Sequence, residues 1–200
     1  MCRSQVKDSA SGHRITHVDL LQGGISGPTL VALLEGLPSL TSLALYSCSS
    51  GAFSALSKHL ALNPVAALTS LSIQSPLPAP HGGGAVADLA SALTLHASLV
   101  HLRLSHCSLG LAGISEVVLM LEHNRVLRHV DLSGNSCPAT GQNRQRAACV
   151  VTWDSLTLNP CLQSLDLSKC QLGDTEASSL AAALEQNLSV LPKRVHLRIH

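Results

Sequence analysis

Two histidines, His101 and His129, lie 28 residues apart, and each is followed two positions later by a charged residue, Arg103 or Asp131. Two imidazoles and one carboxylate form a donor set that binds several transition metals, so His101, His129 and Asp131 are a candidate metal site. Arg103 argues against this site, because its positive charge would repel a cation. We therefore favour a polar patch that contacts a binding partner, and we expect no cofactor.

Seven cysteines are present, an odd number, and no two form a C-x-x-C pair. This pattern favours neither a zinc site nor a disulfide framework. Cys48, Cys107 and Cys170 each follow a Leu-x-x-Leu-x-Leu segment at the same distance. We expect them to be buried structural thiols that cap backbone amides. The repeats that carry them are not adjacent, which excludes a metal shared between them.

The remaining sequence favours a binding protein rather than an enzyme. No G-x-x-x-x-G-K-[ST] phosphate loop and no G-x-S-x-G element occurs. The net charge of +1 and the 12% of charged residues argue against nucleic acid as a partner. No apolar run approaches the roughly 20 residues of a membrane span, and the first residues lack the apolar stretch of a signal peptide. We expect a cytoplasmic location with reduced thiols, with association with the cytoskeleton as an alternative.

The Leu-x-x-Leu-x-Leu pattern forms an internal repeat that covers most of the chain. Six copies begin near residues 15, 40, 68, 99, 127 and 162. In most copies a Cys or Asn stands three residues after the last leucine. A repeat of this length indicates that each copy is one supersecondary unit that buries its apolar face against its neighbours. Leucine supplies 38 residues and Phe, Tyr and Trp one each, which predicts a thin aliphatic core.

Each copy has the pattern of a strand followed by a helix. The alternation of Leu-x-Leu predicts a short strand with one buried face, and apolar residues three and four apart then predict a helix. The expected parallel strands are residues 43–45, 71–73, 102–104, 130–132 and 165–167. The expected helices are residues 112–123 and 174–187, one that begins near Gly84, and one that includes Trp153. This is an α/β solenoid arc of about six repeats, with strands on the concave face and helices on the convex face.

The ends of the chain depart from the pattern. We expect residues 1–12 to be disordered and residues 13–200 to form the repeat domain, with an atypical last strand near residue 195. Within the arc, aligned repeats place side chains in columns on the concave face. These columns predict a partner-binding surface that consists of His101, Arg103, His129, Asp131, Asp166 and Tyr46.

The segments from Leu99 to Asn124 and from Leu162 to Asn187 resemble the ribonuclease-inhibitor class of leucine-rich repeats. They share with it the Cys after the strand, the Leu-Gly that follows, and the repeat length. The resemblance implies the leucine-rich-repeat solenoid and a protein partner of unknown identity. Ribonuclease inhibitors, nucleotide-binding immune receptors, the Ran GTPase-activating protein, tropomodulins and several axonemal proteins share this module, and a fold does not fix a function.

Four functions therefore remain open. The first is a non-catalytic module that binds a macromolecular partner on the concave face. The second is a regulator of a small GTPase, similar to the Ran activator, although this chain ends with basic residues where that family has an acidic tail. The others are a structural component of the cytoskeleton or axoneme and the sensor region of an immune receptor.

Overall fold

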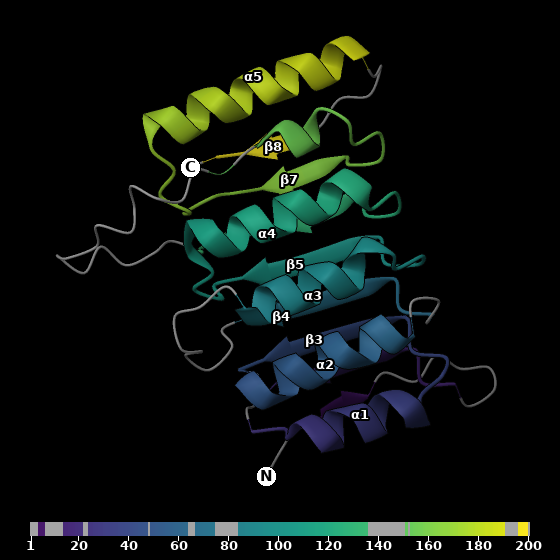
Figure 1. The fold of residues 1–200 in the computed structure, drawn as a ribbon. Helices are drawn as coiled ribbons and strands as arrows, with labels where there is room; N and C mark the ends of the chain where they lie inside the picture. Colours follow the sequence, from purple (N-terminus) through teal and green to yellow (C-terminus); the bar gives the residue numbers. More distant parts are fainter. Residues whose placement is uncertain are drawn as a thin grey trace, which may run out of the picture.

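The computed structural model describes residues 4–6, 14–21, 24–47, 49–63, 67–74, 84–135, 151, 153–190 and 196–199. Strands and helices alternate along the chain (Figure 1). The strands are β1 Ser4–Val6, β2 His17–Leu20, β3 Ser42–Tyr46, β4 Ser70–Gln74, β5 His101–Ser105, β6 His129–Asp131, β7 Ser164–Asp166 and β8 His196–Arg198. The helices are α1 Gly27–Gly36, α2 Ser50–Leu62, α3 Gly84–Thr94, α4 Gly110–His123, the 3-10 helix η2 Trp153–Leu156, and α5 Asp174–Val190.

All eight strands form one open sheet in sequence order. Strands β2 to β8 pair in parallel, each with the next in the sequence, which is the arrangement that crossover connections produce. Helices α1 to α5 are stacked along this one side (Figure 1), so the opposite face carries no helix of the described chain. We call that open face the concave face. This architecture is the predicted leucine-rich-repeat solenoid arc.

The register of the sheet aligns the repeats as their sequences predict. The first apolar residue of each Leu-x-Leu core is the register partner of the same residue on the next strand. These residues are Leu43, Leu71, Leu102, Val130 and Leu165. These side chains point toward the helices and are buried in one continuous aliphatic cluster. Because strand side chains alternate between the two faces, the residues on either side of each leucine are directed to the concave face.

The helices begin and end largely where the sequence indicates. Ser26 and Ser49 cap α1 and α2, and their hydroxyl oxygens accept hydrogen bonds from the backbone N–H groups of Thr29 and Ala52. The Ser49 hydroxyl also donates to the carbonyl oxygen of Ile25 in the preceding repeat. Helix α3 begins at Gly84 as expected. The start of α2 is thus bonded to the repeat before it.

Two predictions about the elements require correction. The helix expected around Trp153 is only the four-residue 3-10 helix η2. Its Trp153 ring is fully buried, and this one large ring occupies core space that several aliphatic residues of a longer helix fill elsewhere. Within the segment expected to be disordered, Ser4–Val6 forms β1, which pairs antiparallel with β2. The edge of β2 offers backbone hydrogen-bonding groups that β1 satisfies. Residues 7–12 of that segment lie outside the described chain.

Candidate binding groove on the concave face

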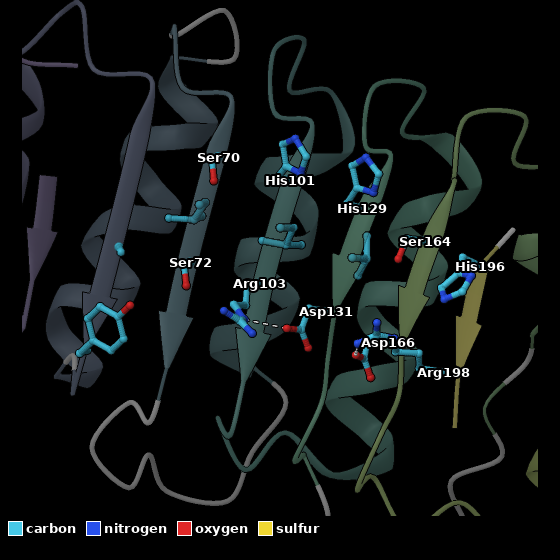
Figure 2. A pocket seen from close by; sticks show the side chains of 15 residues that line it. Ser70, Ser72, His101, Arg103, His129, Asp131, Ser164, Asp166, His196 and Arg198 are labelled. Atoms are coloured by element: carbon cyan, nitrogen blue, oxygen red, sulfur yellow. Dashed lines mark hydrogen bonds and ion pairs between the residues drawn. The ribbon is translucent and has the colours of Figure 1, made fainter. Parts of the chain in front are cut away.

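The concave-face side chains form two rows that run across the strands (Figure 2). Each row collects one residue from each strand between β3 and β8, because the parallel register places equivalent positions side by side. The first row is Ser42, Ser70, His101, His129, Ser164 and His196. The second row is Ala44, Ser72, Arg103, Asp131, Asp166 and Arg198. Most of these residues line a groove of about 530 Å³.

The imidazoles of His101 and His129 are stacked in the first row. Their ring centroids are 4.6 Å apart and their planes differ by 7°. Burial lowers the pKa of His101, and the charge of a protonated His129 lowers it further. The stack is therefore favoured when His101 is neutral, because two imidazolium ions at this distance would repel each other.

Arg103 and Asp131 form the closest ion pair of the groove. The Nε of Arg103 lies 2.7 Å from Oδ2 of Asp131. The other carboxylate oxygen, Oδ1, accepts a hydrogen bond from the backbone N–H of Ser133. Burial alone would raise the pKa of Asp131, but the hydrogen bonds from Ser133 and from Arg103 lower it below its ordinary value. Asp131 is thus held ionised.

Asp166 and Arg198 form a second, looser pair one strand further along. Oδ1 of Asp166 accepts hydrogen bonds from the backbone N–H and the hydroxyl of Ser168. Oδ2 lies 3.9 Å from Nη1 of Arg198, which is too far for a hydrogen bond. Along the row the formal charges therefore run positive, negative, negative, positive, from Arg103 to Arg198.

All six residues of the predicted binding surface line this groove. Five of them lie on three adjacent strands, β5, β6 and β7. Tyr46 is separated from these five by β4, whose Ser70 and Ser72 form a floor of small side chains between them. Ser105, which the register places at the position equivalent to Tyr46 on β5, is buried and does not line the groove.

Two residues of the groove, His196 and Arg198, were not predicted from the sequence. Both lie on β8, which extends the sheet beyond β7. The signal was present, because residues 196–198 repeat the His-Leu-Arg sequence of residues 101–103. The missing Leu-x-x-Leu before residue 196 concealed it.

The candidate metal site lacks its third ligand. His101 and His129 are adjacent, but the Asp131 carboxylate is bonded to Arg103 and Ser133. Among the described residues no cluster of three His, Cys, Asp or Glu side chains has the geometry to hold a metal ion.

The buried cysteine thiols donate to carbonyl groups, and backbone N–H groups of Gly134 and Asn135 bond to the Cys170 sulfur, as predicted for a thiol that caps amides. The Cys107 thiol donates to the carbonyl oxygen of Ile73 at 3.3 Å, and the Cys170 thiol to that of Leu132 at 3.1 Å. Asn135 caps a further amide, because its Oδ1 accepts a hydrogen bond from the backbone N–H of Cys107. Burial raises the pKa of the Cys170 thiol, as expected for a structural cysteine. Cys48 lies outside the described chain.

Comparison with known proteins agrees with this architecture. A family model described as a leucine-rich repeat matches residues 96–118, 123–136 and 158–181, which are parts of the last three predicted repeats. These matches and the strand–helix arc together support a leucine-rich repeat protein. No curated protein matches the sequence. In the described part of the chain, none of the helices has the length and apolar character needed to cross a membrane.

Proposed function

We propose that the chain is a non-catalytic interaction module whose concave groove binds a protein partner. Leucine-rich repeats are generally protein-interaction modules. The observation that carries the proposal is the row of charged side chains on the open face, from Arg103 to Arg198. This row lies on the face of the sheet opposite the core.

The charged row contributes little to the stability of the fold. The Arg103 side chain is 53% exposed, and an ion pair at such a site is worth about 1 kcal/mol or less. The aliphatic core behind the sheet is complete without these side chains. Their removal should therefore leave the fold intact, which makes the groove suitable for a functional test.

The test compares partner capture by the parent protein and by two double variants. Arg103→Ala with Asp131→Ala alters the groove, whereas Lys58→Ala with Asp88→Ala removes one cation and one anion from exposed positions on α2 and α3. Glu122 is unsuitable as a control because it accepts a hydrogen bond from Ser155. Circular dichroism and thermal unfolding verify that each variant is folded.

We expect the groove variant to lose at least tenfold in partner capture, because arginine at an interface centre commonly contributes 2 kcal/mol or more, or about 30-fold in affinity. The helix variant should retain capture. Equal loss from both variants, or no loss from either, would show that the groove is not the binding surface.

A further inference from the structure

The carboxylates of the groove are largely engaged within the protein. Three of the four carboxylate oxygens of Asp131 and Asp166 accept hydrogen bonds, from Arg103, Ser133 and Ser168. The fourth, Oδ2 of Asp166, faces the Arg198 guanidinium at 3.9 Å. These contacts use part of the acceptor capacity of the two carboxylates and offset their charge.

The guanidinium groups retain most of their donors. An arginine carries five N–H donors, and Arg103 uses only Nε toward the described residues. Arg198 makes no hydrogen bond to the described chain through its side chain, which is 64% exposed. Both groups therefore present unbonded N–H donors at the groove surface.

The first row adds further donors. His101, His129 and His196 each carry at least one ring N–H, and none of these rings has a hydrogen bond to the described residues beyond the stack of His101 on His129. The groove has equal numbers of arginines and aspartates, yet its available groups are mostly donors. Its chemistry complements a ligand that is rich in acceptors.

We infer that the groove binds an acidic peptide segment of the partner, with one carboxylate at Arg103 and another at Arg198. This inference rests on the proposed function. Arg198 lies three strands from Arg103, a backbone separation of about 14 Å at roughly 4.8 Å per strand. An extended chain covers that distance in about four residues.

The spacing gives the partner segment a defined pattern. Its acidic residues lie at positions i and i+4, and the residues between them pass over Asp131 and Asp166. A third carboxylate in the middle would meet these aspartates and be repelled, so the middle positions take neutral or basic residues. The hydroxyl and imidazole groups of the first row lie alongside the segment.

The test selects peptides from a phage-displayed random library of 12-residue peptides on the full chain. The affinities of the enriched peptides are then measured by fluorescence polarisation. The groove variant is Arg103→Gln with Arg198→Gln. Its control is Arg14→Gln with Lys58→Gln, which removes two positive charges from exposed positions outside the groove. A third variant, Asp166→Asn, removes a groove carboxylate.

We expect enriched peptides with acidic residues four apart. Their affinity should fall at least tenfold in the groove variant, remain unchanged in the control, and be equal or higher in Asp166→Asn. Basic or neutral peptides that lose affinity in Asp166→Asn would overturn this inference while the proposed function stands. Peptides whose affinity no groove variant changes would overturn both.

Discussion

The stacked imidazoles of His101 and His129 are the part of the groove most sensitive to pH. Their centroids lie 4.6 Å apart on neighbouring strands. The pKa of His101 is lowered first by burial and then by the charge of His129. The unfolded chain binds a proton at His101 more readily than the folded chain does. The neutral ring therefore contributes its full stability to the fold above about pH 6.5. That contribution is lost as the pH falls through the lowered pKa.

His129→Ala should raise the pKa of His101 toward its ordinary value, because the variant removes both the covering ring and its positive charge. A proton NMR titration of the His101 ring in the two proteins measures the change. His196→Ala is the control, since its strand is separated from β6 by β7. If His129→Ala left the His101 titration unchanged or lowered its midpoint, the stacked geometry would be wrong.

Side-chain contacts in the groove could be predicted only in part from the sequence. Strand alternation and the repeat register place His101, Arg103, His129, Asp131 and Asp166 on one face, because both follow from backbone geometry. The ion pair between Arg103 and Asp131 depends on side-chain rotamers that the sequence pattern does not encode. The same is true of the stacked rings of His101 and His129. The cysteine thiols illustrate the same limit, since their burial was predictable but the carbonyl groups to which they donate were not.

At the scale of elements, two asparagines, Asn124 after α4 and Asn159 after η2, join successive repeats. Oδ1 of Asn159 accepts hydrogen bonds from the backbone N–H groups of Cys161 and Leu162, and its Nδ2 donates to the carbonyl oxygen of Leu121 in the preceding repeat. Asn124 makes the equivalent bonds, including one to the Leu93 carbonyl oxygen. These bonds fix each helix-to-strand turn against its neighbour.

His96 occupies this asparagine position after α3 and lacks the same bonds. Its side chain is buried, and neither ring nitrogen has a hydrogen-bond partner in the described chain. Burial lowers its pKa, so the stability contributed by its neutral form is lost as the pH falls below about 6.5.

His96→Asn should stabilise the protein by about 1 kcal/mol, because an asparagine here can form the bonds that Asn124 and Asn159 make. The gain should be larger at pH 5.5 than at pH 8, since the variant also removes a group that must be neutral in the fold. Thermal unfolding at the two pH values measures both effects. A lower melting temperature at both would contradict the role assigned to this position.

The elements themselves were predictable to different degrees. Parallel strands and most helices follow from leucine spacing, because a continuous core requires that spacing in every repeat. The fifth repeat differs since Trp153 allows a short 3-10 helix to cover its part of the core. The sequence predicted β8 only as an atypical strand. Its pairing with β7 depends on backbone hydrogen-bonding groups, which no leucine consensus marks in the sequence.

At the scale of the whole molecule, the arc is a row of repeats whose described elements contact only those of neighbouring repeats. Stability in such an array is close to a sum of repeat and interface contributions. Leu132 is fully buried in the fifth repeat, which has a neighbouring strand on each side. A cavity there should weaken the packing of the repeats around it.

Leu132→Ala should lower the free energy of unfolding by about 2–5 kcal/mol. Leu119→Ala is a matched control on α4, where the leucine is 42% exposed, and it should cost well under half as much. Urea unfolding followed by circular dichroism measures both. An unchanged unfolding midpoint for Leu132→Ala would be incompatible with the continuous core.

The central claim is that the open face of the sheet, rather than the helix side, contacts the partner. The most direct measurement is photo-crosslinking with p-benzoylphenylalanine placed at Tyr46 in the groove or at Leu95, which is 80% exposed at the end of α3. We predict a crosslinked partner from position 46 that disappears when Arg103→Ala and Asp131→Ala are added, and none from position 95. Crosslinking from position 95 alone, or equally from both positions, would contradict the claim.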